Sequence, residues 1–295
     1  MEPIVEPAYA KLNLSLDVLA RRDDGYHDLE MVFQLISLKD ELKLSVAEGT
    51  DIRVASNARF LPSDRDNIAY RCAETFFHAA GMTGWGADIY IEKRIPVCAG
   101  LGGGSADGAA VLRALNRAFS FPLTREQLLE AGASAGADIP FCLIGGTAVG
   151  RGKGEILEPL PGLRGCFVVV KPSFSVSTPE LFHKLDSMRV MLHPDTEGLI
   201  RAIRDGRMDD AGRRFYNVFE DALGRERTTV EDIKSSLLEK GALGAAMTGT
   251  GSAVFGLFRS REEASRAAEA IAGRWRSVFV AEPVEAFGEE NEAEE

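Results

Sequence analysis

The stretch that decides the fold is Pro96-Val97-Cys98-Ala99-Gly100-Leu101-Gly102-Gly103-Gly104-Ser105. An expected strand at Ala87–Lys93 precedes it, and an expected helix from Ser105 to Phe119 follows it. Glycines let a backbone turn its N–H groups toward a ligand, and the N-terminus of a helix adds partial positive charge. The stretch therefore predicts a phosphate-binding loop, with a glycine-rich loop that only packs as the alternative.

Three familiar nucleotide motifs are excluded for this chain. A Walker A loop needs a lysine where Arg151 stands in the segment 145–153. A dinucleotide fingerprint starting at Gly100 needs a glycine at the position of Ser105. The H-R-D and D-F-G segments of protein kinases do not occur.

A second glycine cluster lies at Met247–Ala253, between two strand-like runs. A tight hairpin turn would explain its Gly and Thr residues equally well. Two glycine loops in different halves of the chain nevertheless suggest a nucleotide or phosphorylated substrate that binds across a cleft.

Hydrophobic periodicity predicts interleaved strands and helices, and hence an α+β fold. The first strand is the clearest, because Ala8–Val18 alternates apolar and polar residues. Thr124 with Gln127, and Ser260 with Glu263, have the spacing of helix capping boxes. Further strands are expected at Leu29–Leu38, Glu41–Val46, Thr147–Leu157, Cys166–Lys171, Ala245–Met247 and Ala253–Phe258, and helices at Asn67–Ala80, Arg125–Ala135, within Pro179–Lys240 and at Arg261–Arg274.

A chain of 295 residues is long for one compact core, so two closely packed lobes are expected at residues 1–158 and 159–288, followed by an acidic disordered tail at 289–295. The net charge is -11, but without the seven glutamates after residue 281 the chain is close to balanced. That balance argues against a nucleic-acid partner.

Composition also limits location and metal chemistry. No apolar run approaches the roughly 18 residues of a membrane span, and the N-terminus does not resemble a secretory signal, so a cytoplasmic protein is expected. The four cysteines are widely spaced and only four histidines are present, which disfavours disulfide frameworks and zinc sites. Oligomeric state stays open between monomer and homodimer.

Together these features resemble the GHMP kinase superfamily, which includes galactokinase and the homoserine, mevalonate and phosphomevalonate kinases. The resemblance covers nearly the whole chain and rests on three motifs in the family's order. They are Ala10-Lys11-Leu12-Asn13, Pro96 to Ser105, and Thr248 to Ser252. It implies a two-lobed fold with the active site in the cleft between an ATP-binding catalytic lobe and a C-terminal lobe.

The match sharpens to one branch of the superfamily, which phosphorylates the 2-hydroxyl of a cytidine-diphosphate-linked methylerythritol in non-mevalonate isoprenoid biosynthesis. The segments similar to that branch are Ala10 to Leu14, Asp24-Gly25-Tyr26-His27, Gly136 to Phe141 and Gly145-Gly146. The resemblance implies ATP and Mg²⁺ as cofactors. The residues that it implies for ATP are Pro96, Gly100, Leu101, Gly102, Gly103, Gly104, Ser105 and Ala106, with the Ser105 hydroxyl also a candidate for Mg²⁺.

By the family pattern, Asp138 is the base for the acceptor hydroxyl, and Lys11 orients it and stabilises charge. Lys11 and Asn13 are two residues apart on the polar face of a strand, so both can point into one site. Plainer explanations exist: Asp138 before Pro140 could cap a helix, and Lys11 could lie on an exposed strand face.

The cytidine end of the acceptor has its own implied residues. Tyr26 would stack on the base, His27 would bond to it, and Phe182 would cover its other face, although core packing explains Phe182 equally well. The remaining implied acceptor residues are Asn13, Thr178, Thr248, Gly249 and Gly251.

The chain departs from the family pattern directly after the loop. Ala106 replaces a common second serine, and Gly108 lies inside a helix, where glycine costs about 1 kcal/mol relative to alanine. Both are interpreted as tuning ATP affinity.

Three other functions compete with this reading. Gly132-Ala133-Ser134-Ala135-Gly136 matches the nucleophile elbow of hydrolases, but that motif needs a preceding strand. A nucleotide sensor without catalysis would not need Lys11 or Asp138. A mevalonate or homoserine kinase should lack the Tyr26-His27 pair.

Overall fold

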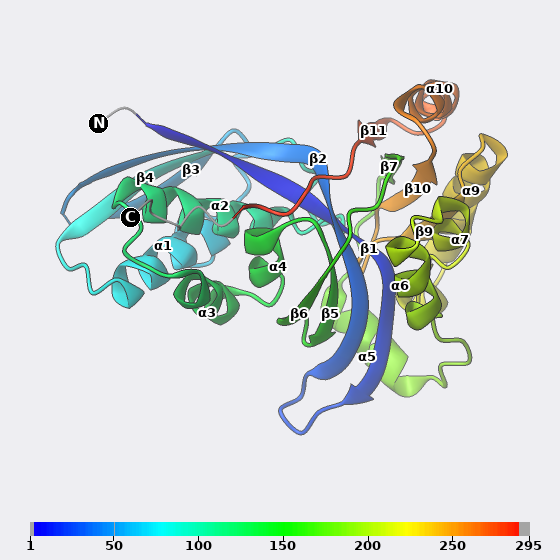
Figure 1. Ribbon diagram of the computed structural model, residues 1–295, viewed down its shortest axis with the longest axis horizontal. Helices are drawn as coiled ribbons and strands as arrows, with labels where there is room; N and C mark the ends of the chain where they lie inside the picture. The colour runs from blue at the N-terminus through cyan, green and yellow to red at the C-terminus, as the bar shows by residue number, and fades with distance from the viewer. Residues whose placement is uncertain (1–2, 50, 289–295) are drawn as a thin grey trace.

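The computed structural model describes residues 3–49 and 51–288, so the predicted acidic tail lies outside the described residues. Two mixed layers of strands and helices lie side by side, and the long strands β1 and β2 belong to the first of them (Figure 1). The first sheet has the strand order β3-β4-β2-β1-β8, and β5 joins it on β2 and β6 on β5. Its strands are β1 (Ile4–Arg21), β2 (His27–Glu48), β3 (Ile52–Ser56), β4 (Trp85–Glu92), β5 (Thr147–Gly152), β6 (Ile156–Leu160) and β8 (Tyr216–Asn217).

Four helices cover this sheet. The second of them, α2, contacts β1 and β2 directly, and α1 packs on α2. Leu112 and Leu115 of α2 and Phe76 of α1 are fully buried, so one continuous apolar core joins helices and sheet. The helices are α1 (Ile68–Ala79), α2 (Gly103–Ala118), α3 (Arg125–Ala135) and α4 (Ile139–Ile144).

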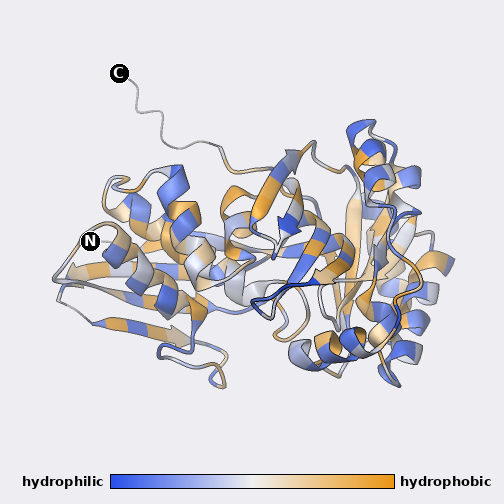
Figure 2. Cartoon of the chain, turned by 90° about the horizontal axis from the view of Figure 1, so that it is seen from below, coloured by the Kyte–Doolittle hydropathy of each residue, from blue (hydrophilic) through white to orange (hydrophobic). Residues whose placement is uncertain are grey.

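The second layer is an antiparallel sheet with the order β11-β7-β10-β9, with α10 against β7 and β11 and α9 against β10 and β9. The outer helices of the molecule carry hydrophilic and hydrophobic residues in alternation (Figure 2). The strands are β7 (Cys166–Lys171), β9 (Gly244–Met247), β10 (Val254–Phe258) and β11 (Ser277–Ala281). The helices are α5 (Thr178–Ser187), α6 (Thr196–Arg204), α7 (Met208–Gly212), α8 (Phe219–Ala222), α9 (Glu226–Glu239) and α10 (Arg261–Ile271).

At two places a segment from the second half of the sequence pairs with the first layer. Strand β8 comes from the second half of the sequence yet pairs with Ser15 and Leu16 of β1. The segment after β11 returns to the first layer, where the Val284 N–H donates to Leu35 and the Phe287 N–H donates to Ile144. The pairing of β1 with β2 is interrupted between Tyr9 and Lys11. The segment after β11 bonds to the backbone of β2 at this interruption. We propose a lobe boundary in the connection between β6 and β7, with residues 282–287 lying on the first lobe.

Most expected elements are confirmed with shifted ends. The helix at Arg125–Ala135 and the strand at Cys166–Lys171 have the predicted bounds, and Thr124 and Gln127 form both bonds of a capping box. Ser260 caps α10, but the Glu263 carboxylate accepts from the Arg259 N–H instead of closing the second box.

The structure departs from the prediction at two places, where expected strands are merged or divided, and it agrees with the argument against a hydrolase. The two strands expected at Leu29–Leu38 and Glu41–Val46 are one strand, β2, and the strand expected at Thr147–Leu157 is the hairpin β5–β6. Ser134 lies inside α3, where its hydroxyl donates to the Ala131 carbonyl, so no strand precedes the G-x-S-x-G motif.

Gly108 has a packing role that its position in a helix does not suggest. A Cβ added there would lie 2.7 Å from the Cys72 Sγ atom and 2.9 Å from the Ile68 Cγ2 atom, both on α1. Glycine at this position therefore lets α1 and α2 approach closely, and its helix-propensity cost is offset by the packing of the two helices.

We expect Gly108→Ala to lower the free energy of unfolding by about 1–3 kcal/mol, because overpacking outweighs the gain in helix propensity. Urea unfolding measures the change. Gly273→Ala is the matched control, since no atom lies within 4 Å of its added Cβ. Combining Gly108→Ala with Cys72→Ala should recover part of the loss, and a stabilised Gly108→Ala protein would contradict the packing role.

Candidate active site

Lys11 is a buried ammonium at the centre of the first sheet. Its side chain is 6% exposed; Nζ donates to the Asn13 Oδ1 atom at 2.7 Å and lies 3.2 Å from the Asp138 Oδ2 atom. The alternative of a lysine on an exposed strand face is therefore wrong. A buried ammonium needs compensating partners, and Asn13 and Asp138 supply them.

Two backbone features hold Lys11 in this position. The β1–β2 register shifts between Tyr9 and Lys11 and again between Asn13 and Ser15. Such irregularities change the direction of the side chains next to them, and here they flank Lys11 and Asn13 on both sides. Gly102 has a φ of +67°, and an added Cβ would lie 2.8 Å from the Lys11 Cγ atom. The glycine loop thus lies directly on the aliphatic stem of Lys11.

Asp138 precedes α4 but does not cap it with its side chain. Its carboxylate pairs with Lys11 instead, and the side chain remains 30% exposed. The capping alternative is therefore not what the structure shows. A carboxylate that is held by an ammonium on one side and reachable from solvent on the other can accept a proton from a bound hydroxyl.

The first glycine loop opens α2 two residues earlier than predicted, at Gly103. The Ala106 N–H donates the first hydrogen bond of the helix, to the Gly102 carbonyl, so the N–H groups of Gly103, Gly104 and Ser105 have no partner within the helix. These groups face a cavity of about 390 Å³. Of the eight residues implied for ATP, seven line this cavity; Ala106 is buried and lies outside its lining.

The second glycine loop packs backbone to backbone on the first. Thr248 is fully buried; its Oγ1 atom accepts from the Asn13 N–H at 3.0 Å and donates to the Gly100 carbonyl at 3.1 Å. A Cβ on Gly249 would lie 2.9 Å from the Gly100 carbonyl oxygen. Gly251 and Thr178 line the same cavity, where the Thr178 hydroxyl bonds to the Thr250 hydroxyl at 2.7 Å.

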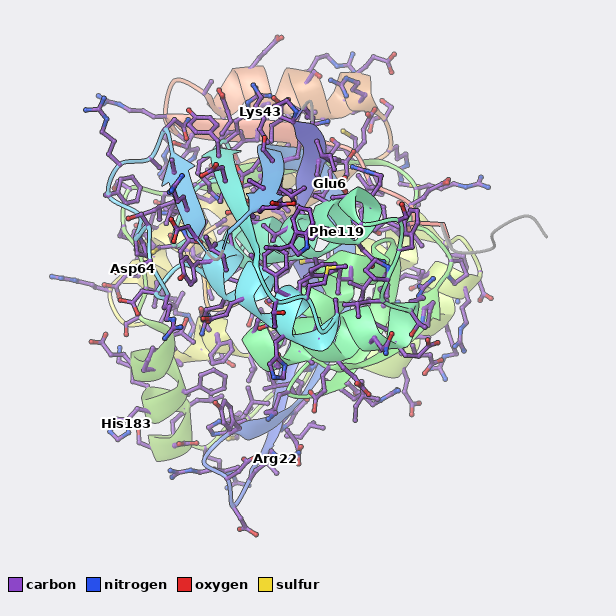
Figure 3. All side chains as sticks on the ribbon, turned by 90° about the vertical axis from the view of Figure 1, so that its left-hand side faces the viewer. Glu6, Arg22, Lys43, Asp64, Phe119 and His183 are labelled. Atoms are coloured by element: carbon purple, nitrogen blue, oxygen red, sulfur yellow. The ribbon has the colours of Figure 1, made fainter. Side chains whose placement is uncertain are left out.

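The residues implied for the cytidine base lie at the hairpin between β1 and β2 and on α5. Figure 3 shows Arg22 and His183 at this same end of the molecule. The His27 ring stacks on Phe182 with 4.7 Å between ring centroids, and its Nε2 atom lies 2.7 Å from the Asp186 Oδ1 atom. Tyr26 is 60% exposed. Thus His27, rather than a base, covers one face of Phe182, and Tyr26 remains accessible.

Asp186 is a residue that the sequence did not single out. A carboxylate only accepts hydrogen bonds, so Nε2 of His27 is the donor in this contact, and in the neutral imidazole Nδ1 is then an acceptor. Its position four residues after Phe182 on α5 places both contacts on one helix face.

A buried ionic cluster beneath the first glycine loop was also missed. Lys93 Nζ lies 2.5 Å from the Asp40 Oδ2 atom and 2.6 Å from the Asp107 Oδ2 atom, and all three side chains are under 10% exposed. Asp40 further accepts from the N–H groups of Arg94 and Ile95. Lys93 and Asp107 line the cavity, and the Asp107 Oδ1 atom has no partner in the described part of the chain.

The cluster carries two carboxylates for one ammonium. Burial raises the pKa of the Asp107 carboxyl from 3.8 to about 8; attraction to Lys93 opposes the rise, and repulsion from Asp40 adds to it. Burial alone would lower the pKa of Lys93, but attraction to both carboxylates raises it. Burial therefore favours the protonated form of Asp107, and the two carboxylates favour the charged form of Lys93.

The structure can also be tested for a metal site. Within residues 3–49 and 51–288, no three His, Cys, Asp or Glu side chains group to hold a metal ion. Mg²⁺ that accompanies a nucleotide is bound mainly by phosphate oxygens and one or two protein oxygens. Ser105, in the first turn of α2, could supply one such protein oxygen through its hydroxyl.

The comparisons with known proteins agree over most of the chain. Residues 67–146 match the GHMP kinases N terminal domain, and residues 199–277 match the GHMP kinases C terminal domain. A 4-diphosphocytidyl-2-C-methyl-D-erythritol kinase of Alkaliphilus metalliredigens is 42% identical over 91% of this chain and 92% of its own length. A relative of the same name from Clostridium tetani is 40% identical over 94% of this chain and 99% of its own length.

Solved structures give the same result. A crystal structure of a 4-(cytidine 5'-diphospho)-2C-methyl-D-erythritol kinase is 34% identical, with a TM-score of 0.78 over 97% of this chain and all of the other. Homoserine kinase from Cytophaga hutchinsonii has a TM-score of 0.75 at 20% identity, over 96% of this chain and 95% of its own, and shows the shared fold alone. No helix in the described part of this chain is long and apolar enough to cross a membrane.

We expect Asp107→Asn to change how stability depends on pH. A carboxyl whose pKa is raised on folding stabilises the folded state fully below its unfolded pKa and loses that contribution as pH rises toward the folded pKa. The melting temperature of the variant, relative to the unchanged protein, should therefore rise from pH 5 to about pH 8 and stay level above it. Asp88→Asn, at an exposed carboxylate, is the control. Parallel curves for all three proteins would contradict the assignment.

Proposed function

The chain belongs to the 4-diphosphocytidyl-2-C-methyl-D-erythritol kinase family of the GHMP kinases, and we propose that it transfers the γ-phosphoryl group of ATP to the 2-hydroxyl of that cytidine-linked acceptor. The observation that carries the proposal is the Lys11–Asp138 pair, directly beside the N-terminus of α2. It combines a base, a cation and a phosphate cradle within one site.

In the proposed reaction, Asp138 accepts the proton of the acceptor 2-hydroxyl as the oxygen attacks the γ-phosphorus. The new O–P bond forms as the bond from the γ-phosphorus to the bridging oxygen breaks, and ADP leaves. Lys11 holds the Asp138 carboxylate in place and offsets negative charge on the transferring group. Phosphoryl transfer depends mainly on positioning and charge stabilisation, which these groups supply.

The ATP phosphates would lie at the mouth of α2, against the free N–H groups of Gly103, Gly104 and Ser105. Mg²⁺ would reduce charge repulsion between the phosphates when bound, with the Ser105 hydroxyl as a protein ligand. Lys93 and Asp107 line the same cavity and support the loop from below.

The acceptor would extend from Asp138 toward the hairpin between β1 and β2. There Tyr26 offers an exposed ring, and His27 offers Nδ1 to the exocyclic amino group of cytosine, which is a hydrogen-bond donor. A uracil in its place would present an oxygen to the same acceptor atom. The His27–Asp186 pair therefore supports cytosine selection.

Other expectations remain predictions of the sequence. They are the cytoplasmic location, the absence of a nucleic-acid partner and the choice between monomer and homodimer.

We expect Asp138→Asn to lower kcat by about 10²–10⁴-fold, because the base is lost while the site keeps its shape. Phosphorylation of the cytidine-linked acceptor, mevalonate and homoserine measures both activity and substrate class. Activity should be confined to the first acceptor. Ser134→Ala, in the hydrolase-like motif, is the control and should retain full activity. Undiminished turnover by Asp138→Asn would remove the base assignment, and turnover of another acceptor would discard the cytidine site.

We expect Asp186→Asn to raise the KM for the acceptor about tenfold, because one charge-assisted hydrogen bond to His27 is lost. The KM for ATP should not change. The physical reason is that an amide no longer dictates which nitrogen of His27 carries the proton. Steady-state kinetics with each substrate varied in turn measures the effect. His183→Ala, on an exposed position of the same helix, should leave both constants unchanged.

A further inference from the structure

The turn between β5 and β6 borders the site next to Asp138. Gly152 and Gly154 both have positive φ values, +68° and +115°, and Lys153 lies between them. A Cβ added to Gly154 would lie 3.8 Å from the Asp138 Oδ1 atom. The Lys153 N–H donates to the Glu155 carboxylate, which fixes the turn.

The side chain of Lys153 reaches from this turn to Tyr26. Its Nζ atom lies 4.6 Å from the centroid of the Tyr26 ring, and the residue is half-buried. Within the described residues no carboxylate lies within ion-pair distance of this ammonium. The nearby carboxylate of Asp24 interacts only weakly with Lys153. The pKa of Asp24 is lowered most by its hydrogen bond from the Tyr26 N–H, then by Arg22, and least by Lys153.

The other two lysines of the site are already compensated. Lys11 is held by Asp138, and Lys93 is held by Asp40 and Asp107. Lys153 is therefore a cation beside the site whose charge is still available to a ligand. An anion between Asp138 and Tyr26 would gain most from it, because partial burial strengthens the attraction.

We propose that Lys153 binds the diphosphate of the acceptor and so sets the preference for a cytidine diphosphate over a cytidine without phosphates. This inference rests on the proposed function, in which the acceptor hydroxyl meets Asp138 and its base meets Tyr26. The diphosphate joins the part of the acceptor that carries the hydroxyl to the part that carries the cytosine. Lys153 lies in the turn beside Asp138, and its Nζ atom lies over the ring of Tyr26. Lys153 is a specificity residue in this account, because it contacts a part of the acceptor that does not react.

The test is the affinity for CDP, measured by titration calorimetry on the full chain with Mg²⁺ and a saturating non-hydrolysable ATP analogue. The analogue prevents CDP from occupying the ATP site. We expect Lys153→Met to weaken CDP binding by about tenfold or more and to leave cytidine binding within about twofold. Lys153→Arg should keep most of the CDP affinity, because it keeps the charge.

Lys39→Met is the matched control. Lys39 lies over the ring of Tyr9 at 5.5 Å, a similar lysine–tyrosine contact elsewhere in the first sheet. Equal weakening of CDP and cytidine by Lys153→Met would overturn the proposal and assign Lys153 to packing on Tyr26. Unchanged CDP affinity, or no CDP binding by the unaltered protein, would overturn it as well.

Turnover of the cytidine-linked acceptor by the unaltered protein separates this inference from the proposed function. If turnover is absent but Lys153→Met still loses CDP affinity, the proposed reaction fails and the diphosphate site stands. If turnover occurs and Lys153→Met has the acceptor KM of the unaltered protein, the reaction stands and the role of Lys153 fails.

Discussion

The buried ammonium of Lys11 is the constraint on which the rest of the site depends. A charge that is 6% exposed is stable only with partners, which here are Asn13 on β1 and Asp138 before α4, while the glycine loop packs on the aliphatic stem. Any movement of one partner leaves a charge unpaired. The same contacts that compensate Lys11 therefore place the proposed base beside the proposed phosphate-binding loop, so the contacts that stabilise the fold also set the geometry of the proposed site.

The glycines of both loops follow from close backbone contact. A Cβ on Gly100 would lie 2.1 Å from the Thr248 carbonyl oxygen, which no side-chain adjustment can relieve. The two halves of the chain meet at this point without intervening side chains, and the Thr248 hydroxyl joins β1 to the first loop. Glycine is thus needed here for packing, in addition to the phosphate binding that we propose for the first loop.

Local sequence carried much of the prediction. Periodicity and capping residues located α3, β7 and the first strand, because these signals depend on near neighbours. The short strands β3, β8 and β11 were missed, since they form only through partners far along the chain. Lys11 and Asp138 came from the resemblance to the motifs of the GHMP kinases. Asp40, Lys93 and Asp186 carry no local signal, because what defines each is a contact made in three dimensions.

Charge compensation explains how a chain with a net charge of -11 can hold two polyanionic substrates. Lys11 and Lys93 contribute no net positive charge to the site, because carboxylates surround them. Attraction for the ATP phosphates must then come mainly from oriented N–H groups at the start of α2 and from the metal that ATP carries. The raised pKa of Asp107 acts in the same direction, since a second full negative charge below the loop would oppose phosphate binding. In the proposed site, preorganised dipoles rather than a surplus of basic residues would bind the ATP phosphates, and Lys153 is the cation proposed for the acceptor diphosphate.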